Sequence, residues 1–509
     1  MPTETESKTH AEALRSTSLI GGSTAIAMLV RMIKTKALAL MLGPAGIGLE
    51  ALFDSTVSLI RTIFDLGISS SGVREIAAAV GTRDERVIST TVYTLRRSCL
   101  VLGILAAATL FFGRAQFSEM AFKSTEHATD FGCLSLMLIL ASISGGQSEL
   151  LQGMRRIRDL AKVNIIGAIS AAALSIPIVY YWGKPGIPAY MLLGGFVSFL
   201  SSWWYSRRVK IERVKVALPE VVTAASSLLK LGLAFMASSL FSTGALYLIR
   251  NIVSREVGIE GTGQFQAANA LSMVYVGFIL QAMGTDFYPR LTAVAHDNAQ
   301  CCRTVNEQAE ISLLLALPGI LGTLACAPWV MHVFYSGKFA VAADILTWQA
   351  TGMLLRVISW PMGFIIMAKG RGAILMLTEF AAYAVYVAFA WLGLKFFGLI
   401  GTGMAFLGLY IFHALMINAV VRKIAGFRWS SGCFKLIWLS IVAGAAGLAI
   451  RLIVAEPWAT IVGFILTAGV GVLCLKRLTA LIGPTEVRRY FRKIPIIKRF
   501  VVAYPAAPS

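Results

Sequence analysis

The sequence predicts an all-α, polytopic membrane protein of about 14 transmembrane helices, arranged as two pseudo-symmetric six-helix bundles with an extra C-terminal helix pair. Its 509 residues are 57% hydrophobic and only 14% charged, whereas a soluble domain is about 45–50% apolar and about 25% charged. Apolar runs of the roughly 20 residues that a bilayer-spanning helix needs recur along most of the chain. Basic residues collect in alternate loops, and a glycine pattern recurs in the two halves.

The apolar runs define fourteen expected spans after a polar, cytoplasmic N-terminus at 1–17. They lie at 18–42, 48–73, 92–112, 128–150, 160–182, 186–206, 228–254, 263–287, 309–334, 341–367, 372–393, 397–421, 433–453 and 457–475. The predicted organisation is an N-terminal bundle at 18–210, a cytoplasmic linker at 211–227, a C-terminal bundle at 228–424, a helix pair at 425–476 and a basic cytoplasmic tail at 477–509.

The net charge is +20, and most of the 46 Lys and Arg residues fall in alternate short loops. Their positions indicate how the chain is oriented in the membrane. Cytoplasmic loops of membrane proteins carry such an excess, so both termini are expected in the cytoplasm. The opposite loops hold few cations, namely Arg114, Lys123, Lys184, Arg255, Lys338 and Lys395. No soluble stretch is long enough for a nucleic-acid-binding module, so no nucleic-acid partner is expected.

The sequence carries no pattern typical of catalysis. It has no GxxxxGK[ST] phosphate loop, no HExxH motif and no CxxC metal-ligand spacing. The longest outer loop, Gly113 to His127, is too short to hold a catalytic domain. We therefore expect a protein that is not an enzyme and that needs neither a cofactor nor a metal.

A glycine pattern suggests an internal repeat. It recurs at a constant offset of 215 residues, as Gly43, Gly46 and Gly48 in the first half and Gly258, Gly261 and Gly263 in the second. An offset that spans six helices preserves direction, which predicts parallel repeats about an axis along the membrane normal. Coincidental turn glycines are the alternative.

Eight cations lie inside the apolar runs: Arg31, Lys34, Lys36, Arg61, Lys230, Arg250, Arg356 and Arg451. Lys36, Lys230 and Arg451 are near enough to span ends to extend their charges into the interface. Each of the others costs roughly 2.5–3.5 kcal/mol at mid-span, and such residues normally mark a substrate path. Arg356, beside Trp360 and Pro361, is either a cavity cation or a packing partner.

Two carboxylates accompany these cations. Asp54, Arg61 and Asp65 fall within about 40° of one another on a helix, so Asp54 and Asp65 are supporting charges. One alternative is that they neutralise Arg61 as an internal fastener between helices. The surplus of Arg31, Lys34 and Arg250 favours an anionic substrate, most simply a phosphate or pyrophosphate. His413, mid-span, is either a proton relay or a hydrogen-bonded interior histidine.

The N-terminal stretch from Ser18 to Arg74 resembles the Wzx-type polysaccharide flippases, which belong to the multidrug/oligosaccharidyl-lipid/polysaccharide exporter superfamily. The resemblance rests on a basic first span, on the turn Leu42-Gly43-Pro44-Ala45-Gly46-Ile47-Gly48, and on Arg61 before Phe64-Asp65-Leu66-Gly67. The stretch Leu313 to Phe339, with Val333-Phe334-Tyr335-Ser336-Gly337-Lys338-Phe339, is similar to the ninth span and outer loop of these proteins. The resemblance covers about the first 420 residues.

The resemblance implies two six-helix bundles around a central cavity that opens to alternate sides of the bacterial inner membrane. The implied substrate is an undecaprenyl-pyrophosphate-linked oligosaccharide, moved from the cytoplasmic to the periplasmic leaflet. It is the repeat unit of an O-antigen, an enterobacterial-common-antigen-like glycan or an exopolysaccharide. A proton or sodium gradient and the polysaccharide polymerase machinery are candidate partners, beside the lipid bilayer itself. Matching the glycines puts Lys34 and Arg61 at cavity positions, with Arg250 as third contributor.

Three alternatives stay open. The first is a lipid II flippase, because spans thirteen and fourteen are shared with that protein and depart from the twelve spans of most Wzx proteins. A multidrug extruder of the same superfamily should carry an uncompensated carboxylate within its spans, whereas cations outnumber acids here. A scaffold that does not transport would tolerate loss of the cavity charges.

Overall fold

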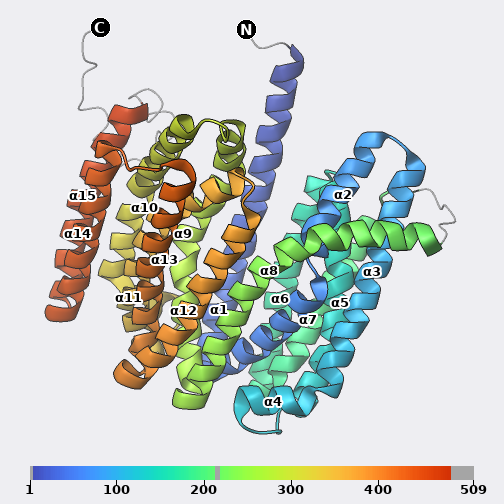
Figure 1. Cartoon of the computed structure of the whole chain (residues 1–509). Coiled ribbons are helices and arrows are strands. Elements are labelled where there is room, and N and C mark those ends of the chain that lie inside the picture. The colour runs from blue at the N-terminus through green and yellow to red at the C-terminus, as the bar shows by residue number, and fades with distance from the viewer. Residues whose placement is uncertain (1–3, 212–217, 483–509) are drawn as a thin grey trace. The chain divides into compact units, whose positions relative to one another are not determined.

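The computed structural model describes residues 4–211 and 218–482, which are almost entirely helical and contain no strand (Figure 1). The α-helices are, in order, α1 (Glu4–Asp65), α2 (Ile68–Thr82), α3 (Glu85–Phe112), α4 (Arg114–Phe122), α5 (Ala128–Gly153), α6 (Ile157–Trp182), α7 (Ile187–Ser206), α8 (Leu218–Val257), α9 (Ile259–Ala293), α10 (Asn298–Phe334), α11 (Ala340–Ala368), α12 (Gly372–Phe397), α13 (Gly401–Ala425), α14 (Ser431–Ile453) and α15 (Trp458–Ile482). The linker residues 212–217 and the tail residues 483–509 lie outside the described residues.

The all-α, polytopic fold is confirmed. Each predicted span coincides with a helix, and α1 carries the first two spans on either side of a kink. In the described ranges, nine helical stretches are long and apolar enough to cross a membrane by length and composition alone. One of them, Gly372–Ala425, contains both α12 and α13. The orientation of the termini stays a prediction.

Two boundaries differ from those predicted. The second span was expected to reach residue 73, but α1 ends at Asp65 and the separate helix α2 follows. The break lies at Gly67, whose φ of 70° is in the left-handed region that glycine adopts at little cost. The outer loop from Gly113 to His127 contains the short helix α4. A hydropathy profile reveals neither the break at Gly67 nor the helix α4, because in both places one helix directly follows another.

The chain divides into two compact units. The first comprises Met1–Ala267 with His332–Phe339, and the second comprises Ala268–Met331 with Ala340–Ser509. In the first unit, α1 packs along α6 and α8, and α5 packs along α3 and α7. In the second unit, α11 packs along α13, and α14 packs against α11 and α15. These two units are defined by which residues lie close together in space. The division into two six-helix bundles, with the boundaries given above, stays a prediction.

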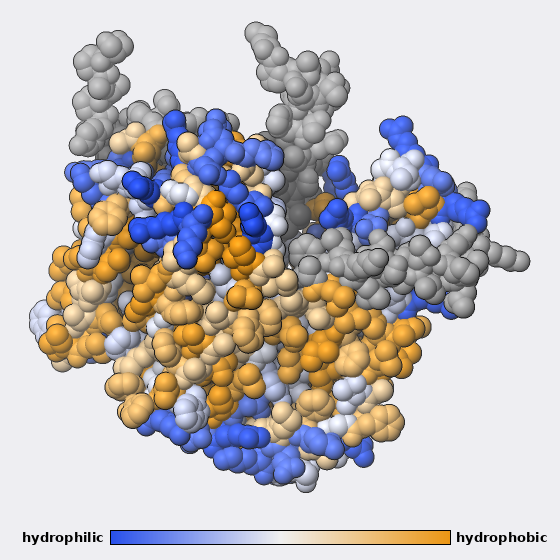
Figure 2. All heavy atoms as spheres, viewed as in Figure 1, coloured by the Kyte–Doolittle hydropathy of each residue, from blue (hydrophilic) through white to orange (hydrophobic). Residues whose placement is uncertain are grey.

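The side chains follow the pattern expected of a bilayer-spanning protein. Figure 2 shows hydrophobic residues over the middle of the helices and hydrophilic residues at their ends. Large apolar side chains are exposed there; Leu377 and Phe396 of α12, for example, are 74% and 75% exposed. Such exposure suits lipid tails, since the bilayer core is as apolar as a protein interior.

The repeated glycines form two kinks that pack against each other within the first unit. We call residues 43–48 the first kink and residues 258–263 the second kink. Gly43 has a φ of 63° and its equivalent Gly258 a φ of 90°. A Cβ on Gly48 would lie 2.0 Å from the Ile259 carbonyl oxygen, and one on Gly263 would lie 1.9 Å from the Pro44 carbonyl oxygen.

These two contacts are the same contact made twice. Pro44 and Ile259 are 215 residues apart, as are Gly48 and Gly263. Each kink therefore presents the same atoms to the other, which is the reciprocity that a two-fold axis produces. The structure thus supports the internal repeat, and the backbones approach so closely that only glycine fits at both positions.

The loops next to the kinks, which the sequence predicts on the outer side, also make contacts between the two repeats. Lys123, which follows α4, donates from Nζ to the carbonyl oxygen of Arg255 at the end of α8, over 2.9 Å. Lys36 of the first repeat donates from Nζ to the His332 carbonyl oxygen of the second over 2.8 Å. Within the second repeat, Gln264 donates to the Lys338 carbonyl oxygen over 2.8 Å. A loop of each repeat therefore contacts the helix next to the kink of the other repeat. All of these residues belong to the first unit.

Candidate functional site

The first kink brings a predicted site cation onto a carboxylate. Lys34 Nζ lies 2.8 Å from Glu50 Oε1, and both side chains are largely buried, at 18% and 24% exposure. A straight helix would separate two residues sixteen positions apart by about 24 Å. The left-handed conformation of Gly43, followed by Pro44, folds α1 back so that the pair forms. The ammonium also lies 5.0 Å from the ring centre of Tyr190 on α7.

The second kink makes the corresponding pair with different chemistry. Arg250 of α8 donates from Nη2 to Gln266 Oε1 of α9 over 2.6 Å, again across sixteen residues. Arg250 is buried, with 8% of its surface exposed. The structure therefore places both Lys34 and Arg250 beside the kinks of their own repeats. Each is held by an acceptor from the helix that follows the kink.

Acidic side chains balance this cluster more than the sequence suggested. Asp54 is exposed and lies within electrostatic range of Arg250, Glu50 and Lys34. Sequence reasoning missed Glu50, although it lies four residues before Asp54 on the same helical face. It also missed Gln266, which carries no charge and gave no signal in an apolar run.

The alternative in which Asp54 and Asp65 neutralise Arg61 finds no support among the contacts of the described residues. Asp65 accepts from the Ser69 hydroxyl over 2.8 Å, which ties the end of α1 to α2. In the described part of the chain, Arg61 makes no ion pair with Asp54 or with Asp65. Arg61 is exposed, as is Arg31 near the start of the first span.

Arg61 shares its surroundings with Glu149 of α5, a buried carboxyl group that sequence reasoning missed. A Cβ on Gly145 would lie 3.4 Å from Arg61 Nη2 and 3.7 Å from Glu149 Oε1, so both groups approach the space beside this glycine. Glu149 is 7% exposed. It lies near the end of the predicted span 128–150.

Arg356 belongs to the second unit and lies between two aromatic rings. Its guanidinium carbon is 5.1 Å from the Trp360 ring centre and 5.6 Å from that of Tyr410. Nη1 lies 2.9 Å from Met273 Sδ, a weak acceptor, and buried Nε has no partner among the described residues. Such a cation–π arrangement holds the guanidinium in place while leaving donors for an anion.

His413 lies close by in the same unit. Its Nδ1 is 3.0 Å from the Ser359 hydroxyl, and its ring stacks edge-on against Tyr410 at 5.9 Å. This contact suits an interior histidine held by a hydrogen bond. The role of His413 in proton transfer stays a prediction.

An apolar groove of about 490 Å³ runs between α11, α13 and α14 in the second unit. Its lining includes Leu355, Ile358, Ile411, Leu415, Trp429 and Ile441. The groove contains no charged lining residue, so it suits a hydrocarbon chain.

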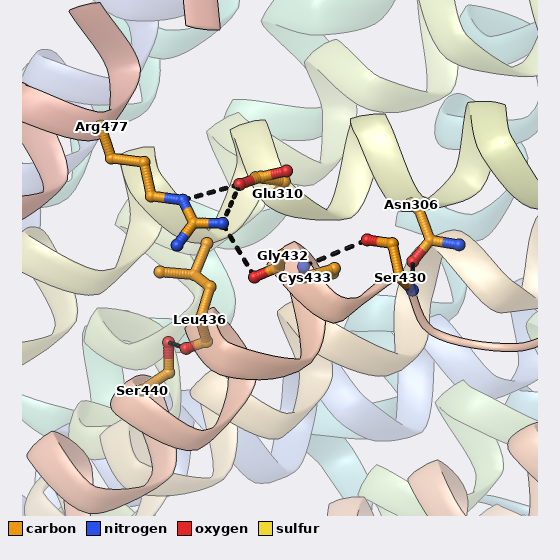
Figure 3. A network of polar contacts seen from close by, with 8 residues as sticks. All are labelled: Asn306, Glu310, Ser430, Gly432, Cys433, Leu436, Ser440 and Arg477. Atoms are coloured by element: carbon orange, nitrogen blue, oxygen red, sulfur yellow. Dashed lines mark hydrogen bonds and ion pairs between the residues drawn. The ribbon is translucent and has the colours of Figure 1, made fainter. Parts of the chain in front are cut away.

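The C-terminal helix pair is fastened to α10 by a polar network (Figure 3). Arg477 of α15 donates from Nε to Glu310 Oε1 over 2.7 Å and from Nη2 to the Gly432 carbonyl oxygen over 2.8 Å. Asn306 of α10 accepts from the Ser430 backbone over 2.7 Å, and the Ser430 hydroxyl caps α14. These bonds make the pair, and one wall of the groove, part of the second unit.

Two named relatives cover most of the chain. The lipid III flippase of Escherichia coli (strain K12) is 21% identical over 411 residues, which covers 77% of this chain and 94% of the relative. The putative O-antigen transporter of Shigella flexneri is 25% identical over 393 residues, covering 75% of this chain and 91% of the relative.

Solved structures share the fold. An inward-facing transporter of the multidrug resistance MATE family aligns with a TM-score of 0.70 at 17% identity, covering 79% of this chain and 94% of that one. The lipid II flippase MurJ, in an inward closed conformation, aligns with a TM-score of 0.68 at 12% identity over 91% of this chain and 99% of that one.

The sequence model of a family described as polysaccharide biosynthesis protein matches residues 13–294, more than half of the chain. The matched region contains both kinks and the pairs Lys34–Glu50 and Arg250–Gln266. The chain therefore belongs to the polysaccharide biosynthesis protein family, which confirms its resemblance to the Wzx-type polysaccharide flippases.

Proposed function

We propose that the protein is a flippase that moves an undecaprenyl-pyrophosphate-linked oligosaccharide from the cytoplasmic to the periplasmic leaflet of a bacterial inner membrane. The observation that carries the proposal is the pair of equivalent cation–acceptor contacts, Lys34–Glu50 and Arg250–Gln266, beside the two kinks. The names of the relatives, a lipid III flippase and a putative O-antigen transporter, point to the same substrate class.

The pyrophosphate binds by competing for the two cations. A phosphate oxygen is a stronger acceptor for a guanidinium than the neutral amide of Gln266, because its negative charge adds Coulombic attraction to the hydrogen bond. Lys34 must leave Glu50 to bind the same anion, which makes it the weaker contributor. The exposed Arg31 and Arg61 attract the anion toward the first unit.

The second unit, taken by itself, has two features that suit this class of substrate. The apolar groove between α11, α13 and α14 accommodates part of the polyprenyl chain, which then stays out of water. Arg356, with Trp360 and Tyr410, offers donors and aromatic faces to sugar hydroxyls.

Transport follows from a change at the kinks. The glycines let the helices on either side of each kink rotate, as repeat-built transporters do around a central site. With both termini in the cytoplasm and the cell interior negative, each negative charge that moves outward gains about 2.3 kcal/mol per 100 mV. Release on the outer side requires the loop contacts of Lys36 and Lys123 to open.

Deleting the gene tests the proposal. We expect one undecaprenyl-pyrophosphate oligosaccharide to accumulate in the membrane, with loss of a surface polysaccharide, measured by mass spectrometry of extracted lipids. Genes encoding the wild type and the Arg303→Ala control should restore transport, because Arg303 is 82% exposed and only pairs with Glu307. Arg250→Ala should not.

Two outcomes would contradict the proposal. If deletion causes no build-up but sensitises the cells to cationic drugs, the protein is a multidrug extruder. If Arg250→Ala protein inserts normally and transports fully, the kink cations are not the substrate site. A build-up of lipid II in particular would identify the alternative flippase activity.

A further inference from the structure

Glu149 is buried among four helices of the first unit. It lies on α5, which packs against α1, α2 and α3. A Cβ on Gly72 of α2 would come within 3.1 Å of its Oε2, so α2 covers that oxygen closely. Oε2 is inaccessible to water and has no hydrogen-bond partner among the described residues.

The charges around Glu149 do not neutralise it. In the described part of the chain, the titratable groups that act on it are Arg61 and Asp65 of α1, with the thiol of Cys99 on α3 in the same cluster. One cation and one anion oppose each other, and α2 contributes a glycine at the contact. Arg61 is near but forms no ion pair with Glu149 among the contacts of the described residues.

An ionised carboxylate in such a place is costly. A buried carboxylate needs an ionic partner and hydrogen bonds to its lone pairs. Without either, the charged form is destabilised by several kcal/mol. A neutral carboxylic acid avoids that penalty. A proton on Glu149 would also leave Arg61 without a competing carboxylate.

We propose that Glu149 is a proton-binding site that controls whether Arg61 is available to the anionic substrate. When the acid is protonated, as this geometry favours, Arg61 is free to meet a phosphate. When the proton leaves to water, the carboxylate forms and draws Arg61 across the space beside Gly145 into an ion pair. Because Arg61 cannot serve both anions, the proton and the phosphate bind cooperatively, and the coupling is reciprocal.

This inference rests on the proposed function, since it concerns binding of the same pyrophosphate. It goes further by naming a proton as a second ligand of the site and Glu149 as its acceptor. It also accounts for a carboxyl group buried among four helices, a position that otherwise adds only cost.

The test measures pyrophosphate binding to the purified full-length protein in nanodiscs as a function of pH. We expect wild-type affinity to fall with rising pH, approaching about tenfold per pH unit once the acid form is depleted. Glu149→Gln keeps a neutral group of the same shape, so its affinity should stay at the low-pH value and lose this dependence. Glu307→Gln, an exposed acid, is the matched control and should behave as wild type.

A second readout does not depend on the variant folding. Adding pyrophosphate to wild-type protein in weak buffer, near the middle of its pH dependence, should cause net proton uptake, and Arg61→Ala should abolish the uptake. Wild-type binding without proton uptake would overturn the inference, as would a Glu149→Gln protein that keeps the wild-type pH profile.

The two proposals fail differently. If wild-type protein binds no pyrophosphate at any pH, the proposed anion site fails. Infrared absorption then decides on Glu149 alone: we expect a carboxylic acid band that disappears in Glu149→Gln and persists in Glu307→Gln. If that band does not exist, Glu149 holds no proton and the inference is wrong.

Discussion

The two kinks have the same backbone and different side chains. Each has a left-handed glycine, Gly43 or Gly258, and each presses a second glycine against a carbonyl oxygen of the other. At the first kink the cation Lys34 meets the carboxylate of Glu50, whereas at the second Arg250 meets the neutral amide of Gln266. Asp54 also acts electrostatically on Arg250.

This difference indicates a division of labour between the repeats. The shared glycines preserve the geometry that both halves need in order to move. The acceptors differ in charge, since Glu50 carries a carboxylate and Gln266 a neutral amide. An anion should therefore depend more strongly on Arg250 than on Lys34, although both occupy equivalent places in the repeat.

The largest expected effect comes from filling the contact between the kinks. Gly263→Ala would place a Cβ 1.9 Å from a backbone oxygen, and Gly48→Ala one 2.0 Å from its equivalent. A backbone oxygen cannot move aside as the end of a flexible side chain can. We therefore expect each variant to lose roughly 3 kcal/mol of stability. Thermal unfolding in detergent measures this. Gly244→Ala, with open space on α8, is the control, and equal melting temperatures would refute the close approach.

The next effect compares the two cations directly. Arg250→Ala should weaken pyrophosphate binding about 100-fold and Lys34→Ala about tenfold, as expected for losing charge-assisted hydrogen bonds of about 1.5–3 kcal/mol. Isothermal titration of purified protein gives both values. Equal losses would show that the acceptor opposite each cation does not matter, and would break the comparison.

Exchanging the acceptors sharpens the comparison. Glu50→Gln gives the first kink the chemistry of the second, so Lys34 should bind pyrophosphate more readily, by several-fold. Gln266→Glu should weaken binding by a similar factor, because Arg250 then holds a carboxylate. Binding that changes in the same direction in both variants would contradict the model of competing acceptors.

The smallest effect concerns the left-handed glycines. Gly43→Ala and Gly258→Ala should each lose about 1–2 kcal/mol of stability, since L-residues avoid this region of backbone conformation. The two losses should match if the kinks are equivalent. Unequal melting temperatures would mean that the packing around the kinks differs more than the backbone does.

Much of the fold was predictable because membrane helices are constrained by simple physics. Every backbone polar group in a bilayer must be satisfied, which makes each long apolar run a helix. The repeat was predictable from its glycines, and the offset of 215 residues correctly paired Lys34 with the neighbourhood of Arg250. The helices α2 and α4 were not predicted. The helix α2 continues the apolar run of the second span beyond the break at Gly67, and the nine residues of α4 are too few and too polar to form a span.

The site divides in the same way. The sequence by itself determined the apolar spans, the equivalent glycines and which spans carry cations, because composition and spacing act locally. Only the tertiary structure decided the partners: Glu50 for Lys34, Gln266 for Arg250, and a buried place beside Arg61 for Glu149. The reason is that a kink joins residues sixteen positions apart, and a bundle joins residues of different helices, at distances that no helical period encodes.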